Sequence, residues 1–247
     1  MSYAVAVLRS VLFNLFYIGW TAMLGLLCLP LLLAGSHDRI QACARLWLSG
    51  FRKAARILLG LDYRVEGLEH VPQGACLIAA KHQSAFETFV FHALLDDPVY
   101  VLKQELMQIP LLGWYMARAG MIGIDRSGGA KALKGMLREA KKAVGKGRQI
   151  VIFPEGTRTM PGKPKPYQPG VAALALSLEV PVIPVAVNSG LFWPRNSFVK
   201  TPGTITIQIL PPLESGLTRK AFMGALENAI EGASTALLPA PEASEPP

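Results

Sequence analysis

The residues of this chain best suited to chemistry are His82 and Glu87, which lie five positions apart. An apolar run, residues 75–80, leads into this stretch, and a helical pattern, residues 86–95, leads out of it. Both side chains therefore fall at a predicted strand-to-helix corner, where a side chain can point out of a sheet into a cleft. A histidine paired with a carboxylate is the usual general base at neutral pH.

The same residues have a structural interpretation. Ser84 and Glu87 fit the S-x-x-E pattern of a capping box, in which the glutamate closes the first turn of a helix. His82 would then be an ordinary loop residue. This corner alone favours the capping box, whereas the rest of the chain favours the general base.

Polar residues follow three other apolar runs in the same way. The runs are residues 120–124, 149–153 and 180–187, and the polar residues after them are 125–126, 154–158 and 188–190. In α/β proteins ligands bind where the ends of strands gather their loops. Arg126 and Arg158 at two such ends could hold a phosphate by bidentate, charge-assisted hydrogen bonds. The alternative is a structural salt bridge, Arg126 with Asp125 or Arg158 with Glu155.

The elements that must position these corners alternate between strands and helices from residue 62 onward. The predicted strands are residues 63–66, 76–80, 99–102, 121–124, 149–153, 182–187 and 204–209. The predicted helices are residues 86–95, 112–119, 130–144, 171–178 and 219–238. This alternation predicts one α/β domain over residues 62–238, with a mixed, largely parallel sheet flanked by helices. The Pro- and Glu-rich residues 239–247 are predicted to be a disordered tail.

The composition of the 247-residue chain is that of a membrane-associated protein. Hydrophobic residues make up 51% and charged residues 17%, and the net charge is +8. A basic and apolar chain suggests an anionic membrane surface, and no module or aromatic-basic pattern suggests a nucleic-acid partner. Cys28, Cys43 and Cys76 form no C-x-x-C pair and are odd in number, so we expect three buried thiols without a disulfide or zinc site.

Residues 1–61 are predicted to be membrane-associated helices. Residues 11–35 carry no charge and are long enough to cross a bilayer, although a signal peptide or a helix that enters one leaflet and returns near Pro30 would also fit. Residues 37–61 form a basic amphipathic pattern with Trp47, typical of a helix at the headgroup interface. Spanning and one-leaflet docking both remain open. If the chain spans, the Arg/Lys excess after Gly35 places the remainder in the cytoplasm.

The ordered set of corners resembles the 1-acyl-sn-glycerol-3-phosphate acyltransferase family over about residues 62–215. Residues 153–158 match the family's F-P-E-G-T-R pattern at every position, and residues 120–126 and 180–185 resemble its I-D-R and V-P-[VI]-[IV]-P-V patterns. Residues 103–106 resemble its K-x-E-L segment. His82 to Glu87 resembles H-x-x-x-x-D, with the difference that the family usually carries Asp where this chain has Glu87.

The resemblance implies transfer of a fatty acyl group from acyl-CoA or acyl-acyl carrier protein to the sn-2 hydroxyl of lysophosphatidic acid, giving phosphatidic acid. His82 would take the hydroxyl proton and Glu87 would fix its tautomer. The implied substrate-binding residues are Lys103, Arg126, Glu155, Gly156, Thr157 and Arg158. Within that set the cations would hold the phosphate, Glu155 would position the acceptor or brace an arginine, and Gly156 would permit a tight turn.

No cofactor or metal is expected, since the donor is a co-substrate. The expected partners are membrane lipid, lysophosphatidic acid and the donor, and the expected location is the cytoplasmic (inner) membrane with the active site on the cytoplasmic side. Other acceptors remain open, namely glycerol 3-phosphate, a lyso-ornithine lipid or another lysophospholipid. Two competing hypotheses are a non-catalytic membrane-binding protein, which the intact His82 and residues 153–158 argue against, and a lipid hydrolase, which the lack of G-x-S-x-G argues against.

Overall fold

The computed structural model describes residues 2–239, so residues 240–247 of the predicted tail lie outside the described part of the chain. Seven strands form one sheet in the order β1-β7-β6-β2-β5-β3-β4. Every neighbouring pair is parallel except β6 and β7, which confirms a mixed, largely parallel sheet. The strands are β1 (Leu61–Glu66), β2 (Leu77–Ala80), β3 (Pro98–Lys103), β4 (Ile122–Ile124), β5 (Gln149–Ile152), β6 (Val182–Val187) and β7 (Gly203–Ile209).

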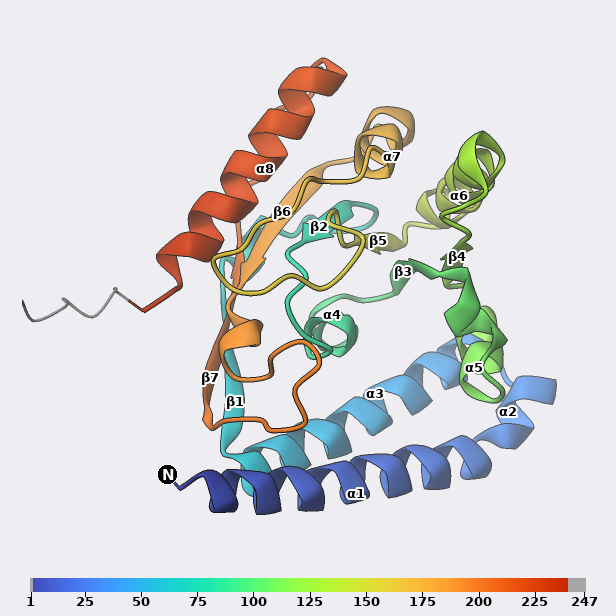
Figure 1. Ribbon diagram of the computed structural model, residues 1–247. Helices are drawn as coiled ribbons and strands as arrows, with labels where there is room; N and C mark the ends of the chain where they lie inside the picture. The colour runs from blue at the N-terminus through green and yellow to red at the C-terminus, as the bar shows by residue number, and fades with distance from the viewer. Residues whose placement is uncertain (1, 240–247) are drawn as a thin grey trace, which may run out of the picture.

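The helices cover both faces of this sheet (Figure 1). One face carries α6 (Gly129–Val144), α7 (Gly170–Leu178) and α8 (Arg219–Ala236), and the other carries α4 (Glu87–Leu94). Side chains of β2 alternate between two cores: Leu77 and Ala79 pack with the first group of helices, and Ile78 and Ala80 with the second. All four are buried, as expected of a central parallel strand that is covered on both sides.

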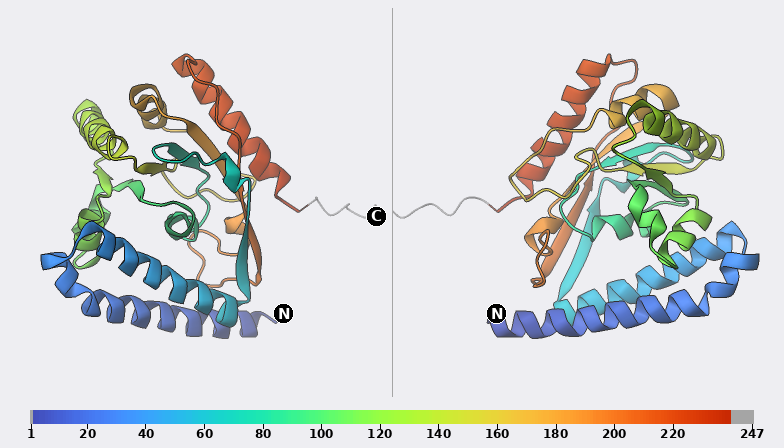
Figure 2. Two further views of the ribbon diagram at one scale, coloured as in Figure 1. Left: turned by 180° about the vertical axis from the view of Figure 1, so that it is seen from behind. Right: turned by 45° about the vertical axis from the view of Figure 1, so that its right-hand side comes forward.

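The N-terminal residues form a layer along the base of the molecule (Figure 2). It consists of α1 (Tyr3–Leu27), α2 (Leu29–Ala34) and α3 (His37–Ala54), and α3 continues as a π-helical turn, Ala55–Leu59. The uncharged stretch is thus not one helix, because it breaks at Cys28, just before Pro30 enters the first turn of α2. Beyond these helices lie α5 (Leu112–Arg118) and short 3-10 turns at Leu68–His70, Gln104–Gln108 and Ser189–Leu191.

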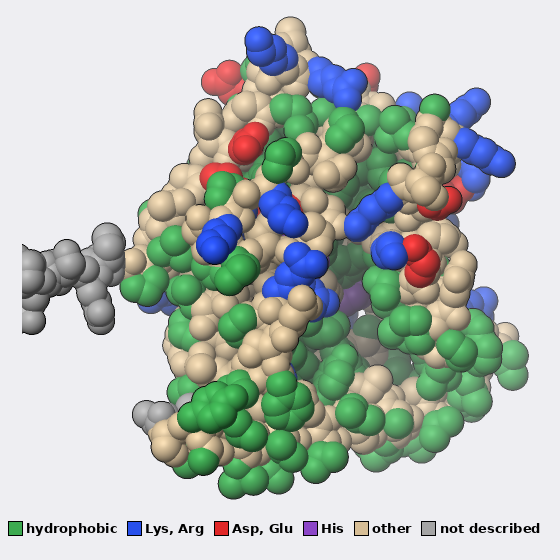
Figure 3. All heavy atoms as spheres, in the orientation of Figure 1, with side chains coloured by type: hydrophobic (Ala, Val, Ile, Leu, Met, Phe, Trp, Pro, Cys, Tyr) green, Lys and Arg blue, Asp and Glu red, His purple; other side chains and the backbone are tan. Residues whose placement is uncertain are grey.

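One side of α1 packs against the domain and the other side is exposed. Phe13 is fully buried and contacts the rings of Phe51 in α3 and Trp193. The hydroxyl of Ser10 accepts a hydrogen bond from the Lys200 N–H at 3.0 Å. The opposite side exposes large apolar side chains, which cover the base of the molecule in Figure 3; they include Leu8, Leu12, Leu15, Ile18, Leu26 and Leu27.

This helix is the one candidate membrane span among the described residues. It is long and apolar enough to cross a bilayer, and 17% of its most apolar window is buried. An exposed apolar surface of this kind on a helix is consistent with membrane association.

The expectation of three free thiols is wrong for two of them. Cys28 and Cys43 are joined in a disulfide, whereas Cys76 is free and buried. The turn at Cys28 folds α3 back against α1, which brings together residues 15 positions apart. Sequence spacing does not reveal this pairing, because it depends on where the apolar stretch bends. Burial raises the pKa of the Cys76 thiol to about 12.

Candidate active site

The structure brings His82 and Glu87 together at the corner between β2 and α4, which we call the base corner. The His82 Nδ1 lies 3.0 Å from the Glu87 Oε1. A carboxylate only accepts hydrogen bonds, so Nδ1 carries the proton and the Nε2 lone pair is free. The Glu87 side chain is fully buried, and the His82 side chain keeps 13% of its surface exposed. The imidazole is therefore accessible while its partner is not.

The Glu87 carboxylate holds the turn before α4 as well as the histidine. Its Oε1 also accepts the backbone N–H groups of Gln83 and Ser84, which lie between β2 and α4. Its Oε2 accepts the Ser189 hydroxyl at 2.7 Å, from the loop after β6. The Ser84 hydroxyl accepts the Phe86 N–H within the same turn. The predicted capping box does not form, because α4 begins at Glu87 and its N-cap, Phe86, makes no side-chain cap hydrogen bond. The carboxylate can hold the histidine, the serine and the turn together, since its two oxygens offer several acceptor positions.

The loop after β5 holds His82 from its other side. The imidazole stacks on the Phe153 ring, with centroids 4.2 Å apart and planes inclined by 21°. The His82 carbonyl accepts the Thr159 N–H at 2.7 Å, and the His82 N–H donates to Glu155 at 3.3 Å. Both the ring and the backbone of His82 are thus fixed before any ligand arrives, which is the geometry expected of a preorganised base.

Glu155 lies inside this loop. Its side chain is fully buried and pairs with the Lys81 Nζ at 3.1 Å. Lys81 also contacts Glu231 of α8, which accepts the Tyr167 hydroxyl at 2.8 Å. Burial raises the pKa of Glu155 and the charge of Lys81 opposes that rise. The carboxylate pairs with a lysine rather than an arginine, and it contacts the backbone of the base corner.

Three cations lie at or after the ends of three strands, and we call them the cation rim. Lys103 is the last residue of β3, Arg126 follows β4 and Arg158 lies in the loop after β5. Lys103 is in register with Ile124, two residues before Arg126. Gly156 has a φ of +67°, a conformation that favours glycine, and a Cβ placed there would lie 3.8 Å from the Arg126 guanidinium carbon. Arg126 therefore lies against the loop that carries Arg158.

The rim side chains are loosely held. Lys103 is about half exposed and pairs with Glu105 at 2.7 Å. Arg126 is exposed, and the half-buried Arg158 lies within electrostatic range of Tyr17 in α1. Among the described residues neither arginine makes the salt bridge that sequence suggested with Asp125 or Glu155. Figure 3 shows a hollow on this side of the molecule, bordered by lysine and arginine side chains above and apolar side chains below.

Sequence reasoning missed four contributors to the base corner: Lys81, Phe153, Thr159 and Ser189. Ser189 could have been suspected from the sequence, because it is one of the polar residues that follow β6. In the sheet β6 lies next to β2, which leads into the base corner. Nothing in the sequence points to Lys81 or Thr159, since their roles depend on partners far away in the chain.

The sequence is similar to known proteins over its α/β domain. A family model described as "Acyltransferase" matches residues 62–188, about half of the chain. The 1-acyl-sn-glycerol-3-phosphate acyltransferase of Pseudomonas aeruginosa is 39% identical over 160 residues, which cover 65% of this chain and 62% of that protein. The protein of the same name from Limnanthes douglasii is 32% identical over 64% of this chain and 57% of its own length. The aligned part thus spans about 60% of these relatives.

The fold also matches a solved structure. The crystal structure of the 1-acyl-sn-glycerophosphate (LPA) acyltransferase, PlsC, from Thermotoga maritima superposes with a TM-score of 0.75. The match covers 94% of this chain and 97% of that one at 23% sequence identity. The similarity therefore includes the N-terminal helical layer as well as the α/β domain.

Proposed function

This chain belongs to the acyltransferase family, and from that premise we propose that it transfers a fatty acyl group from a thioester donor to the sn-2 hydroxyl of lysophosphatidic acid. The product is phosphatidic acid, and the donor is acyl-CoA or acyl-acyl carrier protein. The observation that carries the proposal is the 3.0 Å contact between the His82 Nδ1 and a buried Glu87 carboxylate, which leaves Nε2 as the nitrogen that can accept a proton.

The base corner supplies the proton transfer. A secondary hydroxyl is a weak nucleophile until a base takes its proton. His82 Nε2 accepts that proton as the hydroxyl oxygen forms a bond to the thioester carbonyl carbon. The carbon–sulfur bond then breaks, and the imidazolium returns the proton to the leaving thiolate. Glu87 stabilises the imidazolium between the two steps, and no acyl-enzyme forms because the acceptor supplies the nucleophile.

The cation rim supplies binding. A lysophosphatidic acid phosphate is a dianion that two guanidinium groups and an ammonium group can hold in one orientation. We assign Lys103, Arg126 and Arg158 to that phosphate, with the half-exposed Thr157 beside them. Fixing the phosphate fixes the position of the sn-2 hydroxyl relative to Nε2.

Glu155 and Gly156 position other residues of the site and take no part in the reaction. Glu155 holds the His82 backbone, and Gly156 allows the turn that brings the loop under Arg126. Neither requires direct contact with the acceptor in this proposal.

The N-terminal layer is proposed to hold the active site at the cytoplasmic (inner) membrane, on its cytoplasmic side. Acceptor and product are both lipids, so the hollow must open at the bilayer surface. The apolar side of α1 and the basic residues of α3 suit insertion into one leaflet, with the charges at headgroup level.

The test is acyl transfer by detergent-purified protein. The donors are labelled acyl-CoA and labelled acyl-acyl carrier protein. The acceptor panel is lysophosphatidic acid, glycerol 3-phosphate and a lyso-ornithine lipid, and His82→Ala is the control. Label in phosphatidic acid that depends on His82 supports the proposal. Label only in another product keeps the chemistry and changes the acceptor, whereas no transfer from either donor contradicts the assignment.

A further inference from the structure

A second cavity lies away from the base corner, between α3, β1 and the C-terminal end of α4 with the two residues that follow it. It has a volume of about 420 Å³. Its polar lining residues are Arg45, Ser49, Arg52, Tyr63, His92 and Asp96, and most of the rest are leucine side chains. The three polar residues from α3 are spaced i, i+4 and i+7, so one stripe of that helix forms a wall of the cavity. None of these residues belongs to the base corner or the cation rim.

Both arginines of the cavity keep donors available for an anion. Arg45 donates to the Asp96 carbonyl at 2.5 Å, and Arg52 donates to the Tyr63 hydroxyl at 3.3 Å. Among residues 2–239 neither guanidinium forms an ion pair with a carboxylate. The Asp96 carboxylate is the one acidic side chain of the lining, so two positive charges face one negative charge.

His92 is a largely buried member of the lining. Burial, with a further contribution from the charge of Arg45, lowers its pKa to about 4 against the opposing effect of Asp97. Arg148 adds to the lowering. The imidazole is therefore neutral at pH 7, and its buried Nδ1 has no hydrogen-bond partner. The positive charge of the lining therefore comes from the two arginines, and His92 adds none at neutral pH.

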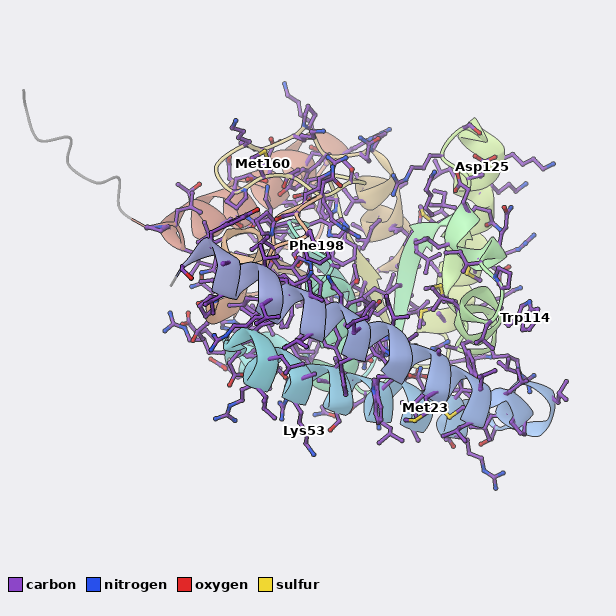
Figure 4. All side chains as sticks on the ribbon, turned by 60° about the horizontal axis from the view of Figure 1, so that its bottom comes forward. Met23, Lys53, Trp114, Asp125, Met160 and Phe198 are labelled. Carbon is purple, nitrogen blue, oxygen red and sulfur yellow. A yellow bond between two sulfur atoms is a disulfide. The ribbon has the colours of Figure 1, made fainter. Side chains whose placement is uncertain are left out.

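We propose that this cavity binds the phosphate of an anionic phospholipid headgroup, separately from the acceptor site. A guanidinium pair suits a phosphate, and the leucine side chains of the lining suit the carbon atoms next to it. A lipid is favoured over free phosphate because α3 lies beside α1 in the base layer, as Figure 4 shows. Leu46 and Ile57 are exposed on α3 and the turn that continues it, so the basic stripe runs at the level where an inserted helix meets headgroups.

The first experiment compares two pairs of charge-removing substitutions on the same helix. Arg45→Gln with Arg52→Gln removes the cavity cations, and Arg39→Gln with Lys53→Gln removes two exposed cations that do not line the cavity. Each protein is floated with vesicles of phosphatidylcholine alone or mixed with phosphatidylglycerol. The cavity pair should lose roughly tenfold more affinity for the mixed vesicles than the matched pair. Equal losses, or no loss, would overturn the proposal, because general attraction predicts the same loss for both pairs.

A conservative variant distinguishes loss of the phosphate site from loss of the fold. Arg45→Lys with Arg52→Lys keeps both charges but loses the planar, two-pronged donors. It should keep the wild-type unfolding midpoint and still lose most of the preference for phosphatidylglycerol. Wild-type vesicle binding by this variant would contradict a built phosphate site.

The second experiment separates a lipid headgroup from free phosphate. The imidazole nitrogens of His92 are followed by NMR during titration with dihexanoyl phosphatidylglycerol or with inorganic phosphate. The short-chain lipid should shift the His92 signals saturably, and phosphate alone should need a far higher concentration. Saturation by phosphate at equal or lower concentration would replace the lipid proposal with a free-anion site. Neither readout depends on acyl transfer, so failure here is distinguishable from failure of the proposed function.

Discussion

The base corner and the cation rim sit on neighbouring strand ends but are built in opposite ways. At the base corner the Glu87 carboxylate is fully buried and accepts hydrogen bonds from a histidine, a serine and two backbone groups. At the rim, Lys103 is about half exposed and pairs with Glu105, two residues away. The first region is held from three segments of the chain, whereas the side chains of the second are exposed or half-buried.

This difference matches the two tasks that the proposal gives them. Proton transfer needs a fixed distance, so its residues must be ordered before the substrate arrives. Phosphate binding needs charge, and long side chains can close on a phosphate from several starting positions. Changes at the base corner should therefore lower kcat, whereas changes at the rim should raise the acceptor KM. Four variants test that division and the contacts behind it, in order of decreasing effect, and a direct comparison of the two regions follows them.

Glu87→Gln should lower kcat by about 10³-fold, because an amide cannot stabilise the imidazolium and would present a donor where Glu87 accepts. Steady-state kinetics at saturating acceptor would measure it. Glu87→Asp is the matched variant, since it keeps the charge on a shorter side chain and should stay within about tenfold of wild type. An equal loss of kcat in both variants would mean that the length of the Glu87 side chain, rather than its charge, determines its role.

Lys81→Met should destabilise the fold by about 3 kcal/mol at neutral pH, because it leaves the Glu155 carboxylate buried without its cation. Burial already raises the pKa of Glu155 in the folded protein, and loss of Lys81 raises it further. A carboxyl with a raised folded pKa stabilises the fold at low pH and loses that contribution as pH rises. The difference in stability between Lys81→Met and the wild type should therefore shrink on acidification. Unfolding midpoints of both proteins at acidic and neutral pH would measure it.

The control for that prediction is Lys142→Met, which removes an exposed lysine paired with Glu139. It should change the unfolding midpoint little at any pH. A similar loss in both variants would show that the buried pair has no special role.

Arg126→Ala should raise the acceptor KM by roughly 30-fold and leave kcat nearly unchanged, because it removes charge-assisted hydrogen bonds to the phosphate. Lys131→Ala, an exposed cation on α6, is the matched control and should have no effect. A changed donor KM with a normal acceptor KM would assign this arginine to the donor instead.

Ser189→Ala should lower kcat by roughly tenfold, the smallest of these effects, because it removes one of four donors to Glu87. The acceptor KM should stay the same. Kinetics that match wild type would show that the remaining donors suffice to hold the carboxylate, and would weaken the claim that the base corner needs all its supports.

The sequence predicted the parts of the molecule whose signal is local. The predicted strands 182–187 and 149–153 coincide with β6 and β5 within one residue, because short apolar runs bounded by polar corners specify buried strands. His82 and Glu87 were found for the same reason, since both lie within one corner. Their closeness to one another needed no knowledge of the fold.

The parts that could not be predicted depend on contacts between distant segments. Ser189 reaches Glu87 across 102 positions, and Lys81 reaches Glu231 across 150. Both contacts depend on the strand order, which places β6 beside β2 and α8 over the same face. The Cys28–Cys43 disulfide was missed in the same way, because uniform apolarity does not show where a helix ends.

The most direct test of the division between base corner and rim is to measure kcat and acceptor KM for His82→Ala and Arg158→Ala side by side. His82→Ala should lower kcat by roughly 10²–10⁴-fold with a normal acceptor KM. Arg158→Ala should raise the acceptor KM about tenfold with kcat nearly unchanged. Substantial turnover by His82→Ala, or the same loss of kcat in both variants, would contradict the assignment of proton transfer to one region and phosphate binding to the other.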